Sequence, residues 1–127
     1  MFVKYGKGRE GIEKYLLDGQ KKDRFFTRDQ LDSRLILSGN LDDLSGVLKS
    51  YSKSTTTGDN YKHFVLTFKE NFIPDNILSS INSDFKRFIT SGYKSDELYY
   101  YAEAHQPKIL GFVTKNQQLT QRKPHIH

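Results

Sequence analysis

The stretch that most constrains the fold is YKHFVLTFKE, residues 61–70, which is followed at once by an amphipathic segment. Aromatic and β-branched residues alternate with polar ones over 61–70, which is typical of a half-buried strand. The next segment, 74–92, carries apolar residues on one helical stripe and ends at Gly92, a common C-cap residue. A strand joined to a helix of this kind predicts a sheet with helices packed on it.

Shorter segments continue the alternation. Apolar runs predict strands over 1–5, 34–39 and 97–108, and helical spacing predicts helices over 11–19 and 40–52, the second with Asn40 as its N-cap. We therefore expect an α/β fold, an α+β sandwich with a central, mainly antiparallel sheet, helices on one face and the other face free for binding. Residues 1–127 form a single domain, which we expect to be C-terminally incomplete because a last strand begins only at Pro124.

Composition limits the chemistry. The 127 residues contain no cysteine, which excludes disulfides, thiolate zinc sites and cysteine nucleophiles. A net charge of +5 makes an anionic partner plausible. The N-terminus lacks the apolar region of a signal peptide, and no stretch approaches the roughly 20 apolar residues of a membrane span. We expect a cytoplasmic protein without membrane insertion.

Three histidines form a candidate metal site. In the HIH motif, His125 and His127 lie two residues apart, so a strand would present both imidazoles on one face. His105 ends the strand over 97–108, and a hairpin-type excursion over 110–122 would bring it opposite the pair. A metal ion that is held by three imidazoles and keeps its other coordination positions open is typical of a catalytic metal site. His63 is interpreted as a partly buried strand histidine.

Tyr15 is a candidate nucleophile. It lies on a short helix bounded by glycines, where Lys7, Arg9 and Lys14 supply positive charge that would attract phosphate. The alternative, which sequence pattern alone favours, is an amphipathic tyrosine on the helix face. Tyr99 and Tyr101 are competing nucleophiles, because they share the strand face of His105.

Several stretches together resemble the N-terminal domain of plasmid mobilisation relaxases, which belong to the HUH endonuclease superfamily. The stretches are GIEKYLLDG, RLILSGNLDDL, YKHFVLTFKE, and YAEAH with KPHIH, and they follow in order over most of the chain. The resemblance implies that Tyr15 attacks DNA and that His105, His125 and His127 hold a divalent ion, magnesium or manganese in function, with zinc or nickel possible in a crystal. The reaction implied is site- and strand-specific nicking at a transfer origin, through a covalent 5′-phosphotyrosine intermediate and with strand rejoining.

Further residues and alternatives follow from these motifs. Glu103 lies two residues before His105 and could orient that histidine, although an exposed edge carboxylate is equally compatible.

Implied partners are single-stranded DNA at a transfer origin and other mobilisation or conjugation proteins. Two other functions stay open: a rolling-circle replication initiator, and a non-catalytic module that stacks single-stranded nucleic acid on an aromatic sheet. The residues expected along the DNA path are Lys7, Arg9, Lys14, Lys21, Lys22 and Arg24.

Overall fold

A five-stranded antiparallel sheet forms the centre of the molecule, with the strand order β1-β3-β7-β4-β2. The computed structural model describes residues 1–9, 11–18, 26–54, 59–94, 98–109 and 111–127. In chain order, the strands of this sheet are β1 (Phe2–Gly8), β2 (Asp32–Ser38), β3 (Tyr61–Thr67), β4 (Ala102–Pro107) and β7 (His125–Ile126). A separate two-stranded hairpin consists of β5 (Gly111–Val113) and β6 (Leu119–Gln121). The expected α+β class and antiparallel sheet are confirmed.

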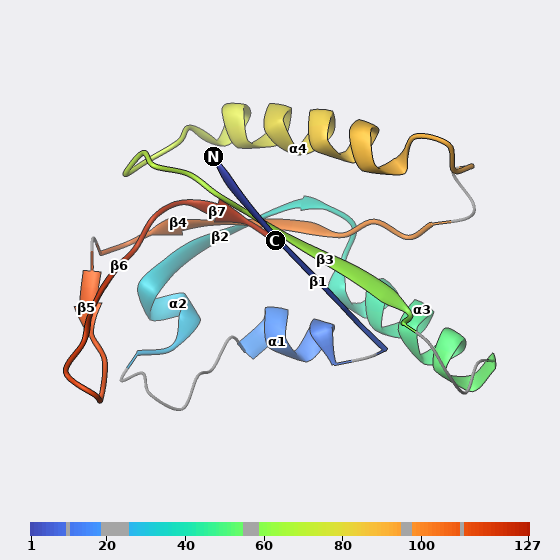
Figure 1. Cartoon of the computed structure of the whole chain (residues 1–127), viewed down its shortest axis with the longest axis horizontal. Coiled ribbons are helices and arrows are strands. Elements are labelled where there is room, and N and C mark those ends of the chain that lie inside the picture. Colours follow the sequence, from blue (N-terminus) through green and yellow to red (C-terminus); the bar gives the residue numbers. More distant parts are fainter. Residues whose placement is uncertain (10, 19–25, 55–58, 95–97, 110) are drawn as a thin grey trace.

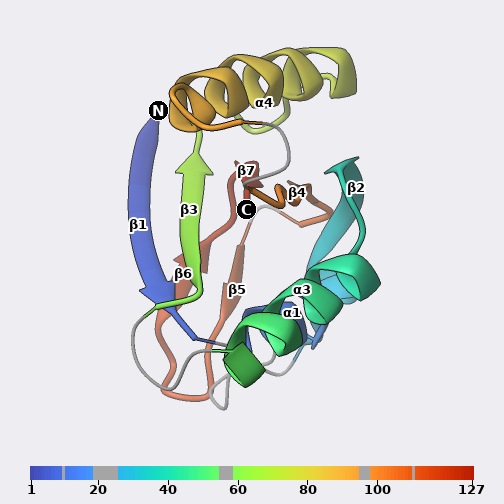
Figure 2. The ribbon, with the colours of Figure 1, turned by 90° about the vertical axis from the view of Figure 1, so that its right-hand side faces the viewer.

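Helices lie on both sides of the sheet. The helix α4 (Asp75–Thr90) covers one face, while α1 (Ile12–Asp18), α2 (Arg28–Leu31) and α3 (Leu41–Ser54) lie on the opposite side (Figure 1, Figure 2). The expectation that helices pack on one face and leave the other free is therefore wrong. The physical reason is that α1 carries its own apolar stripe, Ile12 and Leu16, which is buried on the second face against α3 and Tyr61 of β3.

Each face has its own hydrophobic core. Strand residues that point toward α4, among them Leu66 and Ile126, pack with Leu78 of that helix. On the opposite face a smaller cluster joins Ile12 and Leu16 of α1 to Leu48 of α3. The smaller cluster fixes α1 over the face of the sheet that carries the histidines.

Most predicted elements occur, with shifted ends. The N-cap is confirmed, since the Asn40 side chain accepts a hydrogen bond from the Asp43 amide at 2.7 Å. The strand predicted over 97–108 begins at Ala102, and the hairpin predicted over 110–122 is present as β5 and β6. The short helix α2 was not predicted, because its segment is polar; it is held by a capping box between Thr27 and Gln30. Among the described residues, no helix is long and apolar enough to cross a membrane.

The position of β7 determines which side chains of its segment face α1 and which face α4. Ile126 pairs with Leu66 of β3 on one side and with Ala104 of β4 on the other. Because successive strand side chains alternate between faces, Ile126 points toward α4, whereas its neighbours His125 and His127 point toward α1. The central strand therefore places two histidines on the face that α1 partly covers.

Candidate metal centre

Three imidazoles from two neighbouring strands converge on the α1 face. His105 of β4 lies directly opposite His125 of β7, as the hairpin argument predicted. The ring centroids are 4.7 Å apart for His105 and His125, 4.8 Å for His105 and His127, and 5.0 Å for His125 and His127. One nitrogen from each ring lies within 4.8 Å of the other two, so the three residues could hold a metal ion.

His105 provides the clearest test of whether an ion fits. Its Nε2 lies 2.5 Å from Glu103 Oε2 and donates to that carboxylate, so the remaining lone pair is on Nδ1. Nδ1 is buried and has no hydrogen-bond partner, and Asp32 Oδ2 lies 3.5 Å away. A buried lone pair without a partner is unfavourable, and a cation bound at Nδ1 would satisfy it. The residues present therefore fit a bound cation.

His125 and His127 are held in neutral forms with Nε2 open. His125 Nδ1 lies 3.0 Å from the Lys123 carbonyl oxygen, to which it donates. Burial lowers the pKa of His125 to about 4, against an opposing effect of the Lys123 carbonyl. Burial, together with the neighbouring His125 and His105, also lowers the pKa of His127. Because only a neutral imidazole can bind a metal ion, burial keeps these ligands ready at neutral pH.

Glu103 is fully buried and lies beneath the histidines, so it is not an exposed edge carboxylate. It accepts hydrogen bonds from His105, from Arg34 Nε at 3.0 Å and from the Tyr101 hydroxyl at 2.9 Å. Burial opposes ionisation of Glu103, but the bonds from His105 and Arg34 outweigh it and lower the pKa of Glu103 to about 2. The ionised carboxylate fixes the ring orientation of His105 through this hydrogen bond.

A second carboxylate, Asp32, was not predicted as part of the site. It is buried beside His105 and pairs with the Arg122 guanidinium. Burial opposes ionisation of Asp32, but the neighbouring His105 and Arg122 lower its pKa. Asp32 lies at the start of β2, two residues before the predicted strand, which is why strand periodicity gave no signal for it.

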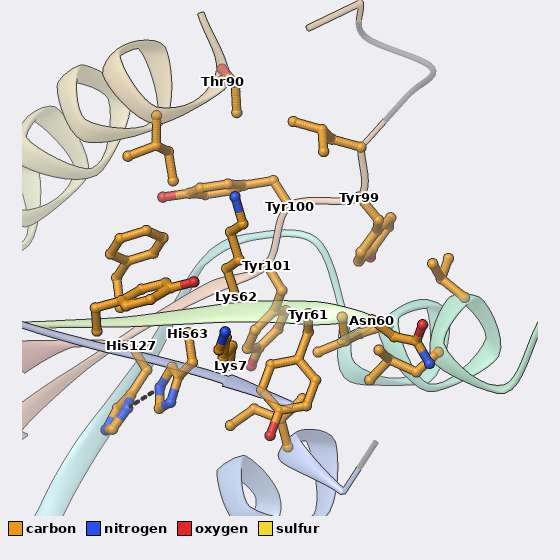
Figure 3. A pocket seen from close by; sticks show the side chains of 18 of the residues that line it. Lys7, Asn60, Tyr61, Lys62, His63, Thr90, Tyr99, Tyr100, Tyr101 and His127 are labelled. Carbon is orange, nitrogen blue, oxygen red and sulfur yellow. Dashed lines mark hydrogen bonds between the residues drawn. The ribbon is translucent and has the colours of Figure 1, made fainter. Parts of the chain in front are cut away.

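His63 is the residue that sequence analysis most clearly missed. Its Nε2 lies 3.1 Å from His127 Nδ1, and the two rings stack with centroids 5.3 Å apart (Figure 3). If His127 held an ion through Nε2, its proton would be on Nδ1 and would be donated to His63. Burial and the nearby Arg28 charge lower the pKa of His63, which favours the neutral acceptor form. Sequence pattern does not indicate that β7 pairs with β3 as well as with β4, and it is the pairing with β3 that brings His63 next to His127.

Tyr15 lies on α1 beside the histidines. Its ring centroid is 6.1 Å from that of His127 and 6.2 Å from that of His63, both in edge-to-face orientation. The Arg28 guanidinium lies 4.9 Å from the Tyr15 ring centroid and donates to the Leu16 carbonyl at 2.7 Å. The Tyr15 side chain remains 37% exposed. The candidate nucleophile is thus next to the candidate metal ligands and still accessible.

The competing tyrosines are engaged elsewhere. The Tyr101 hydroxyl donates to buried Glu103, and the Tyr99 hydroxyl donates to the Asn40 carbonyl at 3.2 Å. The phenol groups of both are therefore committed to hydrogen bonds within the fold, in contrast to the ring of Tyr15, which lies against two histidines.

Among the predicted basic residues that the structure describes, the side chains do not form one group at the histidines. Lys14 is exposed on α1, on the histidine side of the sheet. Lys7 pairs in register with Lys62, so its side chain points to the α4 face, and it forms an ion pair with Asp59 at 3.4 Å. Arg9 follows β1 and is partly buried. Three others lie outside the described residues: Lys21, Lys22 and Arg24.

Comparison with protein-family models, with curated proteins and with solved structures found no match to the chain.

We predict that His63 sets the affinity of the site for metal. In His63→Phe the ring is retained but the acceptor for His127 is lost, so affinity for Mn²⁺ should fall by roughly 10–100-fold. His63→Gln supplies an amide oxygen as acceptor and should restore much of the affinity. Isothermal titration of the metal-free protein measures both; equal affinities for His63→Phe and the parent protein would contradict the role.

We also predict that the metal-free protein loses stability in mild acid. Because the folded pKa of His125 is about 4 and its ordinary value about 6.5, the unfolded chain binds a proton between these values that the folded chain does not. The free energy of unfolding should thus be highest above about pH 7 and fall as pH drops to about 4, by up to about 3 kcal/mol from this residue.

Urea unfolding in the presence of a chelator measures this loss. His125→Phe removes one titrating group and should make the profile shallower between pH 7 and 4.5, while His127 and His63, whose pKa values are also lowered, keep part of the slope. An unchanged slope would show that His125 does not contribute to it. The lowered pKa of Glu103 also makes the free energy of unfolding fall as the pH drops, in this case from about pH 4.5 down to about pH 2.

Proposed function

We propose that this protein is a metal-dependent DNA-nicking endonuclease and strand transferase of the relaxase type. The observation that carries the proposal is the position of Tyr15, whose ring lies 6.1 Å from that of His127 at the edge of a three-histidine cluster. A tyrosine beside three imidazoles is the combination that the sequence motifs predicted, and the two parts come from elements more than 80 residues apart in the chain.

Tyr15 would act by nucleophilic attack. Its phenol oxygen forms a bond to the scissile phosphorus as the bond from phosphorus to the 3′-oxygen breaks, which gives a 5′-phosphotyrosyl link and a free 3′-hydroxyl. The phenol proton is lost as the new bond forms, and the leaving 3′-oxygen gains a proton. Because the phosphodiester is exchanged rather than hydrolysed, the same groups can rejoin the strand.

His105, His125 and His127 would hold the divalent ion. The bound ion would supply a positive charge that stabilises the negative charge developing on the phosphate oxygens. The chain's own contribution is to keep His125 and His127 neutral by burial and to orient the three ligands through Glu103, the Lys123 carbonyl and His63. Imidazole ligands favour zinc or nickel on affinity, whereas magnesium or manganese is the working ion that the relaxase resemblance implies.

Arginines would hold the nucleophile in place. Arg28 and Arg34 both donate to the Leu16 carbonyl, at 2.7 and 2.9 Å, near the C-terminal end of α1. Cations at this end of a helix stabilise it through the helix dipole and satisfy its last carbonyl groups. Since positioning of reacting groups supplies much of the rate in phosphoryl transfer, a rigid α1 is part of the proposed machinery.

We predict that Tyr15→Phe abolishes the covalent adduct. The phenylalanine ring keeps the contacts with His63 and His127, so fold and metal affinity should be retained, while nicking of single-stranded DNA with Mn²⁺ should fall by at least about 10³-fold. Tyr99→Phe is the matched control and should keep activity. Denaturing gels and mass spectrometry of the trapped peptide measure the adduct; a DNA link on Tyr99 or Tyr101 would overturn the assignment.

We predict that His125→Ala separates binding from cleavage. Loss of one ligand should prevent nicking, but binding of a single-stranded oligonucleotide should remain within about threefold, because it depends on phosphate contacts. Binding by both proteins should weaken steeply with salt. Fluorescence anisotropy at several salt concentrations checks this, and binding that is insensitive to salt would contradict the electrostatic argument.

A further inference from the structure

Arg28 is a buried cation beside the candidate nucleophile. It is 7% exposed, and its guanidinium carbon lies 4.9 Å from the ring centroid of Tyr15. Burial is the main cause of the lowered pKa values of His63 and His127, and the charge of Arg28 is a further cause of both. The positive charge of Arg28 therefore acts on the tyrosine and on the histidine cluster together.

Within the described part of the chain, no carboxylate forms an ion pair with Arg28. Other arginines near the histidines differ in this respect. Arg34 pairs with Glu103, with 3.0 Å between Nε and Oε2. Arg122 pairs with Asp32. A buried cation without an anionic partner is unfavourable, so binding of an anion next to Arg28 would stabilise the site.

Two nitrogens of Arg28, Nε and Nη2, are open to a ligand. Nη1 donates to the carbonyl oxygens of Tyr15 at 3.0 Å and of Leu16 at 2.7 Å, which accounts for both of its N–H groups. Nε and Nη2 have no hydrogen-bond partner among the described residues, and neither is one of the side-chain atoms that are buried without a partner. Both nitrogens therefore reach solvent, and they carry three N–H groups between them.

We infer that Arg28 binds the scissile phosphate through Nε and Nη2 and stabilises the negative charge that develops on it as Tyr15 attacks. The inference rests on the proposed nicking function. The parallel N–H groups of Nε and Nη2 match two oxygen atoms of one phosphate group. A guanidinium is not deprotonated in proteins, so Arg28 keeps its proton and the bonds that form and break remain those of the tyrosine attack.

The bonds from Nη1 fix the guanidinium relative to the nucleophile. Because one of them ends on the carbonyl of Tyr15 itself, the open donors and the phenol ring are held on a common frame. Donors that are already in place when charge develops need no reorganisation during the reaction. A role confined to holding α1 would use Nη1 alone, whereas phosphate binding uses the whole guanidinium.

The first test measures phosphate binding without any reaction. Inorganic phosphate is added to the metal-free protein, and the Nε–H resonance of Arg28, assigned by its loss in Arg28→Lys, is followed by NMR. The resonance should shift and saturate, because Nε donates to the phosphate. Arg87, which is exposed on α4 across the sheet, is the internal control and should not shift (Figure 2). No shift at Arg28, an equal shift at Arg87, or an equal shift with acetate would overturn the inference.

The second test measures nicking of single-stranded DNA with Mn²⁺. Arg28→Gln should slow nicking by roughly 10²–10³-fold, and Arg28→Lys, which keeps the charge but not the paired donors, should recover part of the rate. Arg87→Gln is the matched control and should keep the parent rate. A parent rate in Arg28→Gln would overturn the inference and leave the proposed function in place. No nicking by the parent protein, together with a saturable shift at Arg28, would support phosphate binding there and count against the nicking function.

A substrate with a neutral methylphosphonate at the nicked position separates phosphate contact from a role in holding α1. This substrate lacks the charge that Arg28 is inferred to stabilise, so the defect of Arg28→Gln should shrink at least about tenfold on it. A defect of equal size on both substrates would show that Arg28 acts through α1 alone and would overturn the inference. If Arg28→Gln does not fold, Arg28→Lys is compared on the same two substrates.

Discussion

The site depends on one buried carboxylate, Glu103. A charged group at this depth is tolerated only if its oxygens are paired, and here His105, Arg34 and Tyr101 supply the donors. The same Arg34 side chain reaches the Leu16 carbonyl of α1 at 2.9 Å. One ionic network therefore orients a candidate metal ligand and anchors the helix that carries the candidate nucleophile, so the two halves of the site are positioned by a common constraint.

Burial of the histidines adds a second constraint. His105 is fully buried and His125 and His127 are partly buried, and the lowered pKa values of the last two mean that protons are excluded at neutral pH. Excluding the proton leaves lone pairs in a poorly solvated environment, which is unfavourable unless a cation takes them. A bound ion would thus stabilise the folded state, and the same burial that destabilises the metal-free protein in acid makes it selective for metal over protons.

The sequence predicted those parts of the site that depend on local periodicity. The two-residue spacing of His125 and His127, their pairing with His105 across antiparallel strands, and the placement of Tyr15 on a short helix all follow from pattern. His63 and Asp32 could not be found in this way, because their roles depend on strand order: His63 meets His127 only because β7 lies beside β3, and no local pattern encodes that adjacency. The presence of helices on both faces of the sheet was missed for the same reason.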